Sequence, residues 1–163
     1  STRSQLAKAR RLVEVVAVKP LSAEQARMAA RDSRVDLITL PSRPGCFNEG
    51  VASLMELTGV LLELRLAPLI EAGCSSGLLA EYRRWYRLAR GMGVEVVFST
   101  GASSTLEARS PRDLVSLASL ITLNIDKARE GLSRTPWSLL ERNLRKLREG
   151  YVMPGVRVVE DQG

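Results

Sequence analysis

The sequence contains no histidine. This absence excludes most hydrolytic zinc sites, the serine and cysteine catalytic triads, and general acid–base catalysis by imidazole. The two cysteines, Cys46 and Cys74, stand too far apart for a CxxC redox or zinc pair, so we expect free thiols in a reducing cytoplasm. No apolar stretch is long enough to cross a bilayer, and no apolar region of a secretory signal follows the basic opening at residues 1–11. We therefore expect a cytoplasmic protein with no membrane partner.

Lysine is scarce, although the chain is basic. There are 24 basic and 18 acidic residues, which gives a net charge of +6, and the sequence pI is about 9.9. The basic residues are 20 Arg and only 4 Lys. Guanidinium groups make bidentate contacts to phosphate and stack on bases, so this bias favours RNA as a partner. A GC-rich genome or a heat-adapted host explains the same bias equally well.

The chain alternates apolar, strand-like runs with helical patterns. Strand–helix–strand spacing of this kind predicts right-handed βαβ units and a parallel sheet. The capping box of Ser22 and Gln25 begins the first predicted helix, and Gly91 and Gly93 end the third. The predicted strands are residues 12–18, 35–40, 60–66 and 94–98, and the predicted helices between them begin near residue 22 and span 48–57 and 77–90.

The fold class predicted from this pattern is α/β with parallel strands, in a single domain over residues 1–163. Four strands fit either a small open α/β domain or part of a (β/α)8 barrel. A full barrel needs roughly 200–250 residues, so the chain looks like the C-terminal portion of one. It does not begin with Met, and we expect residues upstream. Helices at 111–121, 124–131 and 136–148 should follow the sheet, and residues 151–160 should add a peripheral extended segment.

The segment after the fourth predicted strand carries the most informative motif. Ser110 should cap a helix whose first position is Pro111, with Asp113 closing the box. The same helix start is flanked by Arg109 and Arg112 and follows a glycine-bearing loop at a strand end, which suits a phosphate. The cap and the phosphate role are compatible.

Two further helices carry one-sided positive charge. Helix 77–90 should bury Leu78, Tyr82, Trp85, Tyr86 and Ala89, and on its other face it carries Arg83, Arg84, Arg87 and Arg90. With no acidic partner expected in that stretch, these arginines favour a polyanion. The last helix carries Arg142, Arg145, Lys146 and Arg148, opposed only by Glu141 and Glu149. We expect its apolar residues to be core: Trp137, Leu140, Leu144 and Leu147.

The carboxylates do not form a recognisable metal site. A two-metal nuclease needs several carboxylates that converge at one mouth. Here the candidates lie within predicted strands or near strand ends, with no Asp pair and no histidine: Glu14, Glu63, Glu71, Glu95 and Glu107. Gly101 is a lone glycine and not part of a nucleotide-binding motif. We expect no catalytic residue, no metal and no cofactor on this chain.

The run Ser99-Thr-Gly-Ala102, followed by Arg109-Ser-Pro-Arg-Asp-Leu114, resembles the ribonuclease P protein component 3 family of archaeal and eukaryotic enzymes. The resemblance continues at Leu117, Leu120, Asn124, Ala128, Ser133, Pro136 and Leu140, and it covers residues 12–147. The Arg-Ser-Pro-Arg-Asp signature is fairly specific, whereas the upstream strands match only in pattern. The main departure is length, because family members carry further βα units upstream. An incomplete barrel would expose sheet edges that an assembly partner would have to cover.

The resemblance implies an incomplete TIM-like barrel, related to the polymerase-and-histidinol-phosphatase superfamily but without its metal-binding histidines. It implies a non-catalytic subunit of the archaeal ribonuclease P ribonucleoprotein in tRNA processing, with magnesium on the catalytic RNA. The implied partners are that RNA, a small α/β protein subunit and precursor tRNA. The expected RNA-binding residues are Arg83, Arg84, Arg87, Arg90, Arg109, Arg112, Arg142, Arg145 and Lys146. The alternatives are a metal-dependent phosphoesterase of the same superfamily and a basic scaffold that binds only protein.

Overall fold

A four-stranded parallel sheet forms the centre of the computed structural model, which describes residues 2–40, 45–146, 151–153 and 156–157. The strands are β1 (Ala17–Val18), β2 (Leu37–Leu40), β3 (Leu61–Arg65) and β4 (Val96–Ser99), in the spatial order β1-β2-β3-β4. Each strand pairs with the strand before it in the sequence, as in the wall of a barrel. The α/β class with parallel strands is therefore confirmed.

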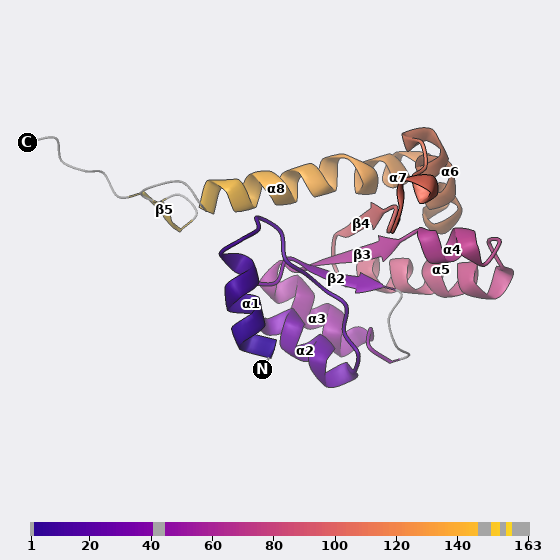
Figure 1. Cartoon of the computed structure of the whole chain (residues 1–163). Coiled ribbons are helices and arrows are strands. Elements are labelled where there is room, and N and C mark those ends of the chain that lie inside the picture. The colour runs from indigo at the N-terminus through magenta and orange to yellow at the C-terminus, as the bar shows by residue number, and fades with distance from the viewer. Residues whose placement is uncertain (1, 41–44, 147–150, 154–155, 158–163) are drawn as a thin grey trace, which may run out of the picture.

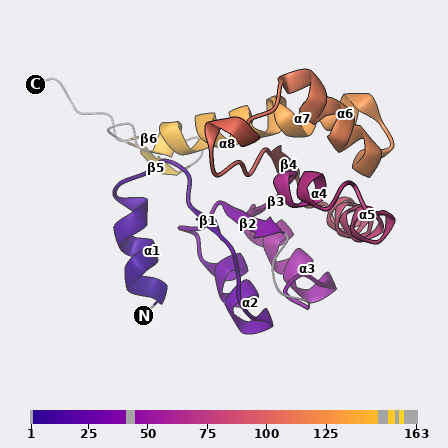
Figure 2. The same ribbon diagram turned by 45° about the vertical axis from the view of Figure 1, so that its right-hand side comes forward.

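The two faces of the sheet are covered differently (Figures 1 and 2). One face packs on α2 (Ala23–Arg31), α3 (Glu49–Thr58) and α5 (Ser76–Gly91), whereas α8 (Arg134–Lys146) lies across the other face. Because side chains alternate along a strand, Leu62 and Leu64 enter the first face and Glu63 and Arg65 the second, as predicted. Leu139 of α8 packs there on a small cluster with Leu37, Leu61 and Val97.

The chain enters the sheet differently from the prediction. A helix that the sequence did not indicate, α1 (Thr2–Arg10), precedes the sheet, and β1 contains only two residues. The sequence predicted a buried strand at residues 12–18, but Leu12 is 81% exposed and Val13 is 45% exposed. The prediction is therefore wrong for the first half of that segment, which is neither buried nor part of the sheet. The backbone N–H of Val16 donates to the Asp36 carboxylate at 2.8 Å, and the chain joins the strand ladder only after this point.

Most of the other element boundaries follow from local capping. Ser22 accepts from the Gln25 N–H at 3.2 Å, while the Gln25 side chain accepts from the N–H of Leu21 rather than that of Ser22. Asn48 caps α3, which ends at Gly59 in the left-handed conformation, φ 70°. The short helix α4 (Ala67–Glu71) was not predicted, nor was the 3-10 turn at Thr105–Glu107.

The outer edge of β4 is covered by this chain itself. Along β4, Glu95 and Ser99 direct their carbonyls to β3, so the carbonyl of Val96 points to the other side. Gly131 lies against that side, in α7 (Ile125–Leu132), which follows α6 (Pro111–Thr122). A Cβ on Gly131 would lie 3.0 Å from the Val96 carbonyl oxygen and 2.7 Å from the Phe98 ring. Helix α7 therefore covers this part of the β4 edge, whereas β1 at the other edge contains two residues.

Helix α8 packs with a different face from the one expected. Its buried residues are Thr135, Leu139 and Asn143, whereas Trp137 is 61% exposed and Leu144 is 43% exposed. Leu140 is half-buried, and Leu147 lies outside the described residues. The prediction that the apolar residues of this helix belong to the core is therefore wrong for Trp137 and Leu144. Polar contacts decide the orientation, because the fully buried Asn143 donates to Asp36 at 2.9 Å and to the Glu14 carbonyl at 2.7 Å.

The extended tail forms a separate two-stranded antiparallel sheet, β5 (Tyr151–Met153) and β6 (Val156–Arg157). It lies beyond the C-terminal end of α8, away from the parallel sheet (Figure 1). The extended segment predicted for residues 151–160 is confirmed where the structure describes it. Residues 154–155 and 158–160 lie outside the described residues.

Leu123, the residue that ends α6, occupies the left-handed region at φ 55° and is 75% exposed. The left-handed conformation is unfavourable by about 1 kcal/mol for a residue that has a Cβ, whereas glycine adopts it at almost no cost. We expect Leu123→Gly to raise the free energy of unfolding by about 0.5–1 kcal/mol in urea denaturation. Leu120→Gly is the matched control, because it removes an exposed leucine from within the helix and should cost about 1 kcal/mol. A loss at Leu123 equal to that at Leu120 would contradict the prediction.

Candidate nucleic-acid interface

The four arginines of α5 lie on its outer side but are not without partners. Arg83 donates from Nε to the Leu120 carbonyl of α6 at 2.8 Å, and Arg87 donates to the Arg83 carbonyl at 3.4 Å. Arg84 pairs with Glu81 at 3.4 Å, so the expectation of no acidic partner in this stretch is wrong. Arg90 is exposed. The outer side of α5 stays strongly basic, with Arg87 and Arg90 its most available cations.

The opposite side of α5 anchors the helix as predicted. Tyr82, Trp85 and Ala89 are buried, and Leu78 and Tyr86 are half-buried. The Tyr82 hydroxyl donates to the Arg65 carbonyl at the end of β3. Burial raises the pKa of Tyr82, so this hydroxyl keeps its proton and remains a donor. The helix is thereby fixed to the carboxyl end of the sheet, and its arginines face outward.

The start of α6 confirms the predicted cap. The Ser110 hydroxyl accepts from the Asp113 N–H at 3.3 Å and donates to the Asp113 carboxylate at 2.8 Å. Just upstream, the Glu107 carboxylate accepts from the Ser103 N–H at 2.7 Å, and this bond lowers the pKa of Glu107. Two carboxylates thus lie near a helix start that was expected to attract phosphate. The phosphate role of Arg109 and Arg112 stays a prediction, and this geometry adds nothing to it.

The third predicted group lies at the other end of the molecule, on the last turns of α8 beside α1 (Figures 1 and 2). Arg142 donates to the Gly59 carbonyl at 3.0 Å and lies 3.9 Å from Asp36. Arg145 pairs with Glu141 at 3.6 Å. Lys146 is exposed overall, but neighbouring groups partly desolvate its ammonium, and this desolvation, followed by the charge of Arg142, lowers its pKa. The structure therefore separates the nine predicted residues into an α5–α6 group and an α8 group.

Asp36 is the residue that sequence reasoning missed. It is 1% exposed and accepts from Arg10 at 2.7 Å, from the Val16 N–H at 2.8 Å and from Asn143 at 2.9 Å. The available signal was a charged residue inside the apolar run of residues 35–40. Its place at the amino end of β2 is typical of a stabilising role, because barrel active sites lie at the carboxyl ends of the strands.

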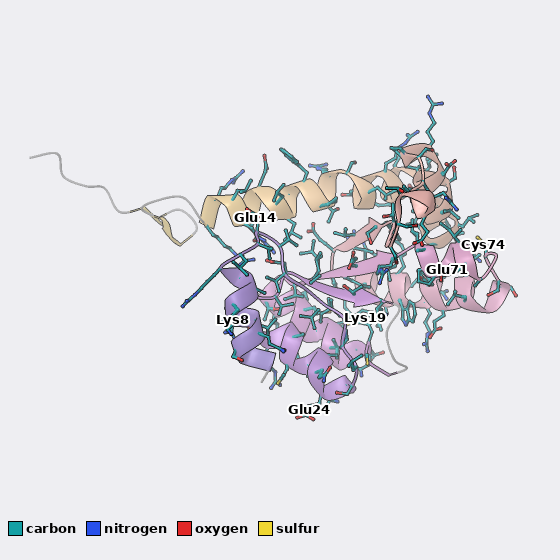
Figure 3. All side chains as sticks on the ribbon, in the orientation of Figure 1. Lys8, Glu14, Lys19, Glu24, Glu71 and Cys74 are labelled. Atoms are coloured by element: carbon teal, nitrogen blue, oxygen red, sulfur yellow. The ribbon has the colours of Figure 1, made fainter. Side chains whose placement is uncertain are left out.

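The carboxyl ends of the strands hold a short polar row. Thr39 donates to Glu63 at 2.5 Å, and Arg65 donates to the Gly101 carbonyl at 2.6 Å. Figure 3 shows Glu14 and Glu71 at opposite ends of the sheet.

Across the described part of the chain, no three His, Cys, Asp or Glu residues lie close enough to hold a metal ion. No helix in that part is long and apolar enough to span a membrane.

Comparison with known proteins identifies the family. The family model described as RNase P subunit p30 matches residues 1–148. The chain belongs to the RNase P subunit p30 family. Ribonuclease P protein component 3 of Haloarcula marismortui is 32% identical over 139 residues, which cover 83% of this chain and 58% of the relative. The corresponding protein of Methanosarcina acetivorans is 29% identical over 163 residues, which cover 98% of this chain and 67% of the relative.

A solved structure of archaeal ribonuclease P with mature tRNA contains a chain with the same fold. The two chains superpose with a TM-score of 0.79 at 22% identity, over 99% of this chain and 71% of that one. The family resemblance read from the Ser99–Leu114 motif is thus confirmed, as is the fold class. This member of the p30 family spans about 58% of the length of its Haloarcula relative.

Proposed function

We propose that this chain is a non-catalytic protein subunit of ribonuclease P, which supports the catalytic RNA in removing 5′ leaders from precursor tRNA. The observation that carries the proposal is the match of the RNase P subunit p30 family over residues 1–148. The arginine-rich composition supports it, because guanidinium groups suit phosphate contacts.

In this proposal the RNA and its magnesium ions perform the cleavage, and the protein neutralises phosphates that would otherwise repel one another. Its partners are the catalytic RNA, the small α/β protein subunit and precursor tRNA, in the cytoplasm. The proposed RNA contacts are the nine basic residues predicted from the sequence. Arg87 and Arg90 are the best candidates on α5, since the carbonyl of Leu120 already binds Arg83 and Glu81 pairs with Arg84.

The decisive experiment is cleavage of a precursor tRNA by archaeal ribonuclease P RNA with the small protein partner, at limiting magnesium. Adding the folded chain should accelerate correctly placed cleavage and lower the magnesium concentration required. The Arg87→Gln/Arg90→Gln variant tests the proposed contacts: both side chains are exposed, so the fold should be kept, and the variant should stimulate less. No stimulation by the folded wild-type chain would overturn the proposal.

The two alternatives predict different results in the same preparation. A metal-dependent phosphoesterase would turn over a phosphate ester in the absence of RNA and respond to manganese or zinc. A scaffold that binds only protein would give flat titrations against RNA at every salt concentration. We expect neither outcome.

A further inference from the structure

Basic side chains from two distant parts of the chain meet beside the amino end of β2. The last turn of α1 carries Lys8 and Arg10, and Arg11 follows. The last turns of α8 carry Arg142, Arg145 and Lys146. Both ribbon views place the C-terminal ends of these helices next to each other (Figures 1 and 2).

Asp36 holds the two helix ends together. One oxygen of its carboxylate lies 2.7 Å from Arg10 Nη1 of α1, and the other lies 3.9 Å from Arg142 Nη2 of α8. Arg10 also donates to the Glu14 carbonyl at 3.0 Å, and Asn143 donates to the same carbonyl at 2.7 Å. Figure 3 labels Glu14 beneath α8, at this junction, and Lys8 further down on α1. Buried contacts therefore bring Arg10 and Arg142 to the same carboxylate.

One carboxylate does not neutralise the three cations around it. Asp36 pairs with both Arg10 and Arg142. The third cation, Lys146, interacts electrostatically with Arg142, Asp36 and Arg10. Partial burial lowers the pKa of Lys146, and Arg142 and Arg10 lower it further against the opposing effect of Asp36. The Nε of Arg142 is buried and finds no hydrogen-bond partner among the described residues. The junction therefore has surplus positive charge and an unused donor.

The rim of the junction adds cations that solvent can reach. Lys8, Arg11 and Lys146 are exposed, and within the described ranges none of them has a carboxylate within 4 Å. Cations near a helix C-terminus favour the helix dipole by about 0.3–1 kcal/mol each, which explains their presence on either helix alone. It does not explain why two such ends lie side by side, where their charges repel.

We propose that the α1–α8 junction is a binding site for the phosphates of an RNA backbone, with Lys8, Arg11 and Lys146 as contacts. The choice of RNA rests on the proposed function. An acidic protein is the rival partner, since Leu12 and Val13 are exposed nearby. RNA is favoured because the proposed contacts are exposed cations with no ion pair among the described residues, and the planar group of Arg11 can bind two phosphate oxygens at once.

The test compares two charge-matched triple variants of the full chain. Lys8→Gln/Arg11→Gln/Lys146→Gln removes the proposed contacts and leaves Arg10, Arg142 and Asp36 intact. The control removes three exposed cations from another region, at Lys19, Arg27 and Arg31. Binding to archaeal ribonuclease P RNA is measured at several salt concentrations. The slope of log affinity against log salt is negative, and each lost phosphate contact reduces its magnitude by about 0.7–0.9, so the magnitude should fall by about 2–3 in the first variant and by less than 1 in the control.

Two results would overturn the site. Equal slopes for the two variants would mean that only overall charge matters. An unchanged slope in the first variant would leave the junction to an acidic protein. Unchanged slopes would not affect the proposed function, which the cleavage assay tests separately. Failure of that assay with a changed slope would count against the proposed function and not against this site.

A second readout distinguishes an RNA backbone from a free anion. A bound phosphate should raise the pKa of Lys146, followed by NMR of the labelled lysine side chains, while Lys19 stays unchanged as the internal reference. RNA should produce the rise at a phosphate concentration at which inorganic phosphate does not. An equal rise with inorganic phosphate alone would overturn the assignment to an RNA backbone.

Discussion

Replacement of Asp36 by Ala should lower the free energy of unfolding by about 3–5 kcal/mol, because it leaves buried charged and polar groups without their partner. The carboxylate is 1% exposed and accepts three hydrogen bonds, from Arg10, the Val16 backbone and Asn143. Its removal would also take away the polar contacts that hold the ends of α1 and α8 at the amino end of the sheet. Urea denaturation followed by circular dichroism measures the loss.

Asp126→Ala is the control, because Asp126 is 84% exposed and its pair with Arg129 spans 3.5 Å, so the change should cost less than about 1 kcal/mol. Asp36→Asn should fall between the two. Its oxygen can still accept from Arg10, but its amide nitrogen would face the donor group of Asn143. A cost below about 1 kcal/mol for Asp36→Ala would show that the junction does not hold the helices.

Replacement of Gly131 by Ala should lower the free energy of unfolding by about 1–2 kcal/mol, although alanine favours a helix by about 1 kcal/mol over glycine. The added Cβ would lie 2.7 Å from the Phe98 ring and 3.0 Å from the Val96 carbonyl oxygen. Helix α7 would have to withdraw from the edge of β4, which would expose part of Phe98. Thermal denaturation and the fluorescence of a bound apolar dye measure the two effects.

Gly77→Ala is the matched control, since nothing lies within 4 Å of a Cβ at that position in α5. It should raise the free energy of unfolding by up to about 1 kcal/mol. Opposite signs for the same substitution in two helices would isolate the contact between α7 and β4. If Gly131→Ala were as stabilising as Gly77→Ala, that contact would not exist in solution.

The parts of the fold that the sequence predicted depend on local chemistry. The caps at Ser22 and Ser110 involve residues three positions apart. The strands at β2, β3 and β4 are short apolar runs bounded by helical patterns. Each of these signals is complete within one segment, so it can be recognised without the rest of the chain.

The errors have a common cause, which is contact between distant segments. The periodicity of α8 indicated an apolar face that includes Trp137 and Leu144, but a hydrogen bond from Asn143 to Asp36, 107 residues away, selects another face. Likewise, the carbonyl that binds Arg83 lies 37 residues further along the chain. No window of sequence contains both partners, so the partition of the arginines into two groups could not be predicted.

The contacts of Asp36 also have a consequence for the order of folding. Strands β1 to β4 pair with their sequence neighbours, so the sheet can assemble through short loop closures, one βα unit after another. The bonds from Asn143 to Asp36 and to Glu14 instead span 107 and 129 residues. Closing loops of that length costs more entropy, so we expect these bonds to form after the sheet. Their loss should then leave the folding rate almost unchanged and accelerate unfolding, which shortens the lifetime of the native state.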